Sequence, residues 1–152
     1  MDFLQKEHIE ADLDAADLSQ AVRKLAAHLV AAHQLSLEAD WVWAQAMERE
    51  AQVSTCFGAG VAVPHCITPL GDSVSAVLGV HRQGGFLGDS PDGEPIRFVI
   101  LLATPEGHRD QHLDYLRRIA ESLGMKPELR AQVLRQSSAA AVWQVLQQPE
   151  PS

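Results

Sequence analysis

Two amphipathic helices are predicted near the start of the chain, because hydrophobic residues recur there at every third or fourth position. The first is expected over residues 18–33, after Asp17, which lies three residues before Gln20 in the spacing of a capping box. The second is expected to be capped by Ser36 and to end near residue 50. The first dozen residues show no such periodicity, so we expect them to form a polar lead-in.

Valine-rich runs in the middle of the chain predict β-strands. One spans residues 74–81 between glycine-containing turns, and a shorter run at 61–63 ends at Pro64. The strongest run, 96–103, is almost continuously hydrophobic. Such a strand is typically buried on both faces of a sheet, which requires helices on both sides of it.

Three more helices are predicted downstream. The first is expected to be capped by Asp110 and to stop at Gly124, and two shorter ones are expected at about 127–136 and 138–147. Helices on both sides of the strands predict an α/β fold with three layers. No internal repeat or interdomain linker is evident, so we expect a single domain over residues 1–152.

Composition narrows the classes of function. The formal net charge of −8 argues against nonspecific nucleic-acid binding, which needs a clustered positive surface, but is compatible with a basic partner protein. No apolar run approaches the roughly 20 residues that span a bilayer. The N-terminus also lacks the pattern of a secretory signal. We therefore expect a cytoplasmic protein without direct membrane insertion. Its cysteines, Cys56 and Cys66, are expected to be free thiols, although a bridge between them stays open.

His65 is the strongest candidate for a reacting group. It follows Pro64, which restricts Val63 and fixes the angle at which the chain enters the site. Upstream, Gly58 and Gly60 allow backbone amides to approach a ligand closely. A neutral imidazole nitrogen is a good nucleophile and a good leaving group once phosphorylated. The sequence therefore predicts a phosphohistidine.

Four further residues are candidates for holding the phosphoryl group. His112 is expected in the first turn of its helix, where free amides and the helix dipole favour an anion. Arg49 offers a guanidinium, and Ser54 and Thr55 offer hydroxyl groups. Taken singly, His65 and His112 also fit ordinary loop and helix-surface positions, and Arg49 also fits a salt bridge on a helix face.

The combined motif resembles a known family. The type-2 enzyme IIA domains of the bacterial phosphoenolpyruvate-dependent sugar phosphotransferase system, the fructose/mannitol class that includes the nitrogen-regulatory IIA proteins, have a similar signature. The resemblance covers about Leu13 to Leu146. The residues that carry it are Glu48-Arg49-Glu50, Ser54-Thr55, Gly58, Gly60-Val61-Ala62-Val63-Pro64-His65, Phe98–Ala103, Pro105, His112-Leu113, Leu116, Ile119-Ala120 and Leu123.

This resemblance implies a mixed β-sheet flanked by helices and a core of about residues 13–146. It implies that His65 accepts a phosphoryl group from the phosphocarrier protein HPr, with His112 and Arg49 as the phosphate-holding histidine and arginine. The group then passes to a IIB domain or, in regulatory members, its presence governs a partner such as a transporter or kinase. We favour the nitrogen-regulatory type, because the two-helix N-terminus and single-domain length suit it. No cofactor or metal is expected.

Three departures from the family pattern leave alternatives open. Cys66 stands where the family usually has glycine, and Cys56 and Ala59 stand where glycine and asparagine are frequent. These changes are compatible with a non-catalytic IIA-like module that regulates a transporter or kinase without turnover. Cys66 beside His65 also raises the hypothesis of redox sensitivity.

Two other chemistries are less favoured. A zinc site would need His65, Cys66 and His112, with His108 or His81, but the sequence has no tightly spaced ligand pair. A cysteine hydrolase with Cys66 as nucleophile is weaker still, because adjacent Cys and His residues in a loop do not form a catalytic dyad.

Overall fold

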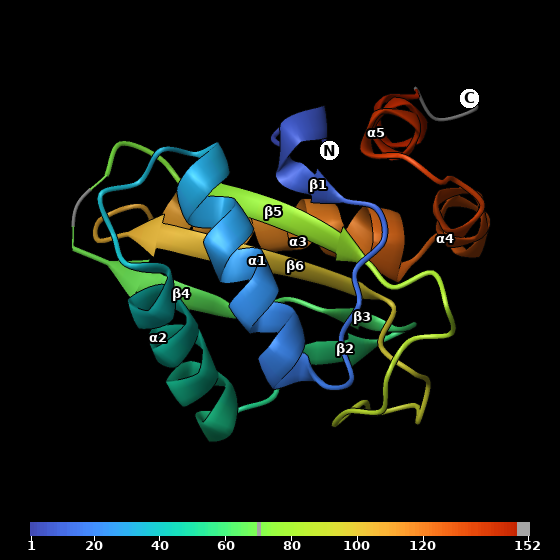
Figure 1. Ribbon diagram of the computed structural model, residues 1–152, viewed down its shortest axis with the longest axis horizontal. Coiled ribbons are helices and arrows are strands. Elements are labelled where there is room, and N and C mark those ends of the chain that lie inside the picture. The colour runs from blue at the N-terminus through green and yellow to red at the C-terminus, as the bar shows by residue number, and fades with distance from the viewer. Residues whose placement is uncertain (70, 149–152) are drawn as a thin grey trace.

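The computed structural model describes residues 1–69 and 71–148, and its centre is one open six-stranded sheet (Figure 1). Strand β6 lies in the middle, hydrogen-bonded to β5 on one side and to β3 and β4 on the other. Five of the six strands follow the order β1-β5-β6-β3-β2. The bounds are β1 Ile9–Glu10, β2 Cys56–Gly58, β3 Val61–Ala62, β4 His65–Thr68, β5 Ser75–Val80 and β6 Phe98–Pro105.

The sheet is mixed, as expected. Strands β3 and β4 run parallel to β6, whereas β5 runs antiparallel to it. Strand β1 is parallel to β5, and β2 is antiparallel to β3. Because β3 and β4 both pair with β6 in the parallel sense, the chain between them brings His65 beside Leu102, close to the carboxyl end of β6.

Helices cover both faces of the sheet, which confirms the predicted three-layer α/β architecture. Figure 1 shows α1 and α2 in front of the strands and α3 behind them, with α4 and α5 near the C-terminus. The structure contains a short 3₁₀ helix, Lys6–His8, and a π-helical turn, Ala120–Gly124, that extends α3. The α-helices are α1 Leu18–Ala32, α2 Ala39–Gln52, α3 Arg109–Ile119, α4 Pro127–Leu134 and α5 Ala139–Gln147.

Alternation along β6 explains why its sequence is continuously hydrophobic. Phe98, Ile100 and Leu102 belong to the core that faces α3, α4 and α5. The residues between them, such as Val99 and Leu101, belong to the core that faces α1 and α2. Each such buried side chain contributes about 1.5–3 kcal/mol through removal from water. Burial on both faces therefore fixes the position of β6 and of the residues at its carboxyl end.

Three expectations about local structure were wrong. The first dozen residues are no polar lead-in, because β1 pairs with β5 and Leu4 and Ile9 are buried in the core. Ser36 does not cap α2, whose N-cap is Glu38 without a side-chain cap hydrogen bond. Asp110 does not cap α3, which begins at Arg109 after His108 as its N-cap. Tertiary contacts explain the first case, and the two helices in the other cases begin without a side-chain cap hydrogen bond.

Asp17 caps its helix as predicted, and Ser138 caps α5. The Asp17 side chain accepts a hydrogen bond from the Gln20 amide at the start of α1, and Ser138 does the same for Ala141 at the start of α5. The predicted strand at 74–81 is present as β5. The sequence also predicts a polar tail over residues 148–152, of which 149–152 lie outside the described residues.

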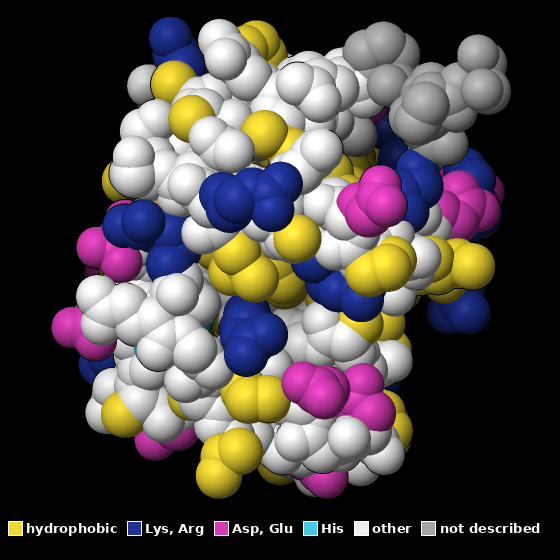
Figure 2. All heavy atoms as spheres, turned by 90° about the vertical axis from the view of Figure 1, so that its right-hand side faces the viewer, with side chains coloured by type: hydrophobic (Ala, Val, Ile, Leu, Met, Phe, Trp, Pro, Cys, Tyr) yellow, Lys and Arg dark blue, Asp and Glu magenta, His cyan; other side chains and the backbone are white. Residues whose placement is uncertain are grey.

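One face of the molecule carries basic, acidic and hydrophobic side chains close together (Figure 2). Figure 2 shows a face on which lysine and arginine side chains are interspersed with hydrophobic ones, although the chain carries a net charge of −8. Net charge alone therefore does not identify a partner surface. In the part of the chain that the structure describes, no helix is both long and apolar enough to cross a membrane.

Candidate functional site

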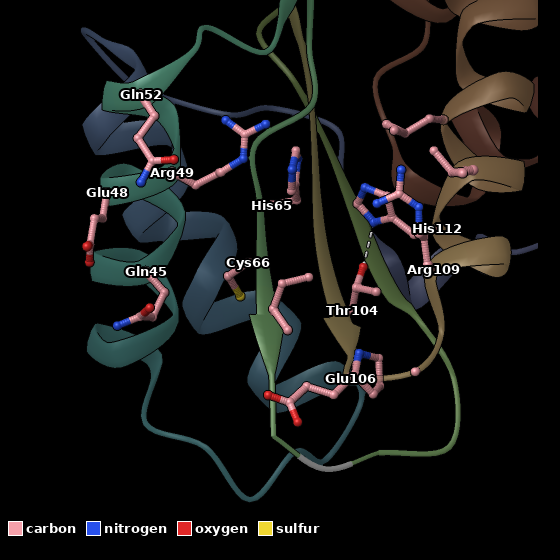
Figure 3. Close-up of a pocket in the computed structure, with 15 residues that line it drawn as sticks. Gln45, Glu48, Arg49, Gln52, His65, Cys66, Thr104, Glu106, Arg109 and His112 are labelled. Carbon is pink, nitrogen blue, oxygen red and sulfur yellow. Dashed lines mark hydrogen bonds between the residues drawn. The ribbon is translucent and has the colours of Figure 1, made fainter.

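The candidate site is an open pocket of about 710 Å³ beside the carboxyl end of β6 (Figure 3). Its lining brings together Arg49 from α2, His65 from β4, Thr104 from β6, and Arg109 and His112 from α3. A second pocket, of about 1000 Å³ between the N-terminus and α4–α5, has no histidine among the described residues that line it. Of the two, the first pocket is therefore the one that offers an imidazole as nucleophile.

His65 is held by its own backbone. Its Nδ1 lies 3.1 Å from the Val63 carbonyl oxygen, across the intervening Pro64. A carbonyl oxygen only accepts hydrogen bonds, so Nδ1 carries the proton and donates it. The neutral ring consequently keeps its lone pair on Nε2, the nitrogen free to attack an electrophile.

His112 lies against His65. The two ring centroids are 4.8 Å apart at an interplanar angle of 69°, an edge contact. The Nδ1 of His112 lies 2.6 Å from the Thr104 hydroxyl oxygen. Burial, then the neighbouring His65 and the cations Arg109 and Arg49, lower the pKa of His112 to about 4. His112 is therefore neutral at neutral pH and acts through hydrogen bonding.

Two guanidinium groups flank the histidine pair. In Figure 3, Arg49 points from α2 toward His65 and Arg109 lies beside His112, whereas Glu48 and Glu106 point away. Neither arginine forms an ion pair within residues 1–69 and 71–148, so the salt-bridge interpretation of Arg49 is wrong. Unpaired cations around a nucleophile suit an incoming anion.

Ser54 and Thr55 do not line the pocket. The Thr55 hydroxyl and amide both donate to the Glu50 carboxylate, at 2.7 and 2.9 Å. The Ser54 hydroxyl donates to the Asp89 carbonyl oxygen at 3.2 Å. Both side chains therefore anchor the segment that leads to His65, and the structure does not bring them to the two histidines.

The glycine-rich segment forms the tight turn between β2 and β3. Gly58, Ala59 and Gly60 all have positive φ angles, of 96°, 59° and 76°. A Cβ at Gly60 would lie 2.8 Å from the Pro95 carbonyl oxygen, so no larger residue fits there without a shift. The Ala59 amide donates to Asp92 at 2.8 Å. Gly58 and Gly60 thus shape this turn and are not among the residues that line the pocket.

The sequence matches the model of the family "Phosphoenolpyruvate-dependent sugar phosphotransferase system, EIIA 2" over residues 2–148. The chain belongs to this family. It is 32% identical over 121 residues to a nitrogen regulatory protein of Pseudomonas aeruginosa, covering 79% of this chain and 77% of that protein. A nitrogen regulatory protein of Bradyrhizobium diazoefficiens is 33% identical over 150 residues, covering 97% of this chain and 94% of the other.

A solved structure supports the same assignment. The crystal structure of the nitrogen regulatory protein IIA-Ntr from Neisseria meningitidis superposes with a TM-score of 0.84 at 26% sequence identity, covering 95% of this chain and 97% of that one. The mixed sheet and its flanking helices are thus those of a type-2 IIA domain, as the sequence motif implied.

Cys66, a departure from the family pattern, is 3% exposed and also contributes to the lining of this IIA pocket. Successive side chains of a strand alternate, and the Cys66 side chain packs into the core on the α1–α2 side of the sheet. Burial raises the pKa of its thiol to about 11, so the reactive thiolate is scarce at neutral pH. A buried thiol with a raised pKa disfavours both the suggested redox sensitivity and the cysteine-hydrolase alternative. Cys56 and Cys66 are both free thiols.

The zinc alternative also lacks its ligands in this IIA domain. Among the described residues, no group of three or more His, Cys, Asp or Glu side chains is placed to hold a metal ion. The His81 ring bonds instead to the Ala15 carbonyl oxygen at 3.1 Å. His108 serves as the N-cap residue of α3 and does not line the pocket.

Sequence reasoning missed Thr104 and Arg109. Arg109 lies three residues before His112, a spacing that brings two side chains to the same side of a helix. Helical periodicity would have indicated Arg109 if the helix had been predicted to begin at that residue. Thr104 had no comparable signal, because its contact joins a strand end to the following helix across a turn.

Proposed function

We propose that this IIA protein is a phosphohistidine carrier that accepts a phosphoryl group on Nε2 of His65. The observation that carries the proposal is the hydrogen bond from His65 Nδ1 to the Val63 carbonyl oxygen, 3.1 Å long, which leaves Nε2 as the nucleophilic nitrogen. The two unpaired arginines and the neutral His112 supply charge and hydrogen bonds for a phosphate group.

The transfer step requires little from the protein beyond positioning of the reacting groups and stabilisation of charge. The Nε2 lone pair attacks the phosphorus of a phosphohistidine donor, forming a P–N bond as the donor's P–N bond breaks. The donor nitrogen recovers the bonding pair, so the exchange itself requires no oxidant and no net proton. Arg49 lies where a guanidinium would neutralise the phosphate oxygens as they pass between the two nitrogens.

The Val63 carbonyl also supports the phosphorylated state. Attachment of phosphorus to Nε2 withdraws electron density from the ring, which makes Nδ1–H a stronger donor. Its bond to the carbonyl oxygen then strengthens, because hydrogen bonds from more positive donors are shorter and stronger. The same contact thus directs the phosphoryl group to one nitrogen and stabilises the product.

The proposed donor is an HPr-like phosphocarrier, and the proposed acceptor is a IIB domain or a regulated transporter or kinase. We favour the nitrogen-regulatory role, because relatives that align with most of this chain are named nitrogen regulatory proteins. A single functional domain and a cytoplasmic location are part of the same proposal. No nucleic acid, membrane insertion, metal or cofactor is invoked.

The test is phosphorylation by phosphoenolpyruvate, enzyme I and HPr, followed by intact mass. The wild type should gain one acid-labile phosphoryl group, and His65→Gln should gain none. His108→Gln is the matched control, since it removes a nearby histidine whose side chain does not cap α3 or line the pocket. It should behave as the wild type does. A well-folded wild type that accepts no phosphoryl group would refute the carrier and support a non-catalytic binding module.

A further inference from the structure

The second histidine of the site has a partner of its own. The Thr104 hydroxyl oxygen lies 2.6 Å from Nδ1 of His112, and Thr104 is only 2% exposed. Thr104 lies near the carboxyl end of β6, whose earlier residues are locked between two cores. The hydroxyl is therefore held in place by the centre of the sheet.

The direction of this hydrogen bond follows from the donors available. Within the described chain, His112 Nδ1 is the one hydrogen-bond partner of the Thr104 hydroxyl. A buried hydroxyl that leaves its proton unpaired is costly, so the Thr104 proton points to Nδ1. Nδ1 then accepts with its lone pair, and the single proton of the neutral ring is on Nε2.

Charge does not compete with this assignment. Burial and the neighbouring His65, Arg109 and Arg49 lower the pKa of His112 to about 4. Protonation of Nδ1 near neutral pH is therefore rare. The tautomer of the neutral ring, set by Thr104, decides which atom His112 presents to the pocket.

We propose that Thr104 is a positioning residue that holds His112 as the Nε2–H tautomer, so that His112 donates a hydrogen bond to the phosphoryl group on His65. This inference rests on the proposed function for its purpose, but the tautomer itself is a property of the unphosphorylated protein. The two rings then have opposite tautomers. His65 offers a lone pair from Nε2, and His112 offers an N–H from the same atom of its ring.

The arrangement has a chemical reason. A nucleophile needs an unprotonated nitrogen, whereas an oxygen of the phosphoryl group needs a donor beside it. If His112 turned or changed tautomer, its lone pair would face a negatively charged oxygen. The hydrogen bond between the Thr104 hydroxyl and Nδ1 of His112 prevents both changes without adding charge.

The first experiment is a long-range ¹H–¹⁵N correlation spectrum of the histidine rings in the unphosphorylated protein, with His112 assigned from its loss in His112→Gln. We expect an unprotonated Nδ1 and a protonated Nε2 in His112, and the reverse in His65. A His112 ring protonated on Nδ1 would overturn the proposal. This readout needs no HPr, so its failure is distinct from failure of the proposed function.

The second experiment measures phosphoryl transfer from HPr in Thr104→Val and Thr104→Ser. Valine keeps the shape and suits a strand, so the fold should persist, as thermal unfolding will check. We expect Thr104→Val to transfer about tenfold more slowly at saturating HPr, which is the scale of one hydrogen bond. Thr104→Ser, which keeps the hydroxyl, should recover most of the rate.

Two outcomes would contradict this role for Thr104. If Thr104→Val transfers as fast as the wild type, the hydroxyl does not act through His112. If Thr104→Ser is as slow as Thr104→Val, the effect comes from packing and not from the hydrogen bond. A wild type with the expected tautomers that accepts no phosphoryl group would instead refute the proposed function.

Discussion

His65 and His112 are in ring contact, yet the chain controls them by different means. The Val63 carbonyl oxygen, part of the backbone, fixes His65. The Thr104 hydroxyl, part of a side chain, fixes His112. A carbonyl can only accept a proton and a hydroxyl can donate one, so the same residue type acquires opposite tautomers.

This difference shows which half of the site an amino-acid substitution can alter. No substitution removes the Val63 carbonyl oxygen, so the orientation of His65 depends on the turn and on Pro64. The contact at His112 depends on one side chain and can be deleted without disturbing the backbone. We therefore expect the nucleophile to tolerate changes around it and the phosphate-holding histidine to be sensitive to them.

The largest predicted effect separates the two histidines by function. Transfer from HPr should be abolished in His65→Gln, since the bond-forming atom is gone. In His112→Gln it should be slowed by about 100-fold, because a preorganised donor is lost while the nucleophile remains. Rapid-quench kinetics with mass detection measure both. Equal and complete loss in the two variants, each correctly folded, would contradict the division of roles.

A smaller effect is predicted for the two arginines. Arg49→Gln should slow transfer by about 30-fold, the scale of a charge-assisted hydrogen bond. Arg109→Gln should slow it by only about threefold, because Arg109 is exposed and its charge is screened by solvent. The two variants lose the same charge, so each controls for the other at several salt concentrations. A larger loss in Arg109→Gln would place the phosphate nearer to α3 than we propose.

The pH dependence of stability tests the environment of His112. The pKa of His112 in the fold is about 4, below its ordinary value of 6.5. The unfolded chain therefore takes up a proton at higher pH than the folded protein, so stability is complete above pH 6.5 and declines as pH falls through 4. For a half-buried ring we expect a loss of about 1 kcal/mol.

This loss is measured by urea unfolding of the wild type and His112→Gln across the same pH range. The wild type should lose more stability than the variant on acidification. Parallel pH profiles in the two proteins would show that His112 is not shielded from solvent as the structure indicates.

The smallest predicted effect concerns the turn that leads to His65. Ala59 has a φ of 59°, a conformation that costs an alanine about 1 kcal/mol. Ala59→Gly should raise the free energy of unfolding by about 0.5 kcal/mol, because glycine's greater unfolded-state entropy offsets part of the relief. The transfer rate should not change, since the turn acts through the backbone. Gly60→Ala is the opposite control and should destabilise the protein.

Much of the fold was predictable because its signals are local. The alternation and length of the run at 96–103 indicated a strand buried on both faces, which β6 confirms. Strands β1, β2 and β4 could not be predicted, because each has two to four residues and exists only through pairing with a longer partner. The polar character of the first dozen residues concealed Leu4 and Ile9, whose burial depends on α4, α5 and the sheet.

Only those parts of the candidate site that belong to the sequence motif could be predicted. His65, His112 and Arg49 were identified from the sequence, and the structure brings them to one pocket. Ser54 and Thr55 share the motif but bond to Asp89 and Glu50 instead. A motif shows which residues matter, whereas the direction of each side chain depends on neighbours that are distant in sequence.

We propose that His65 carries a phosphoryl group on Nε2 because Nδ1 is bound to the Val63 carbonyl oxygen. The most direct measurement is a ¹H–¹⁵N and ³¹P NMR spectrum of the protein after phosphorylation by phosphoenolpyruvate, enzyme I and HPr. We predict one phosphoryl group, coupled to Nε2 of His65, with a proton retained on Nδ1. Phosphorus on Nδ1 of His65, or on another histidine, would contradict the account.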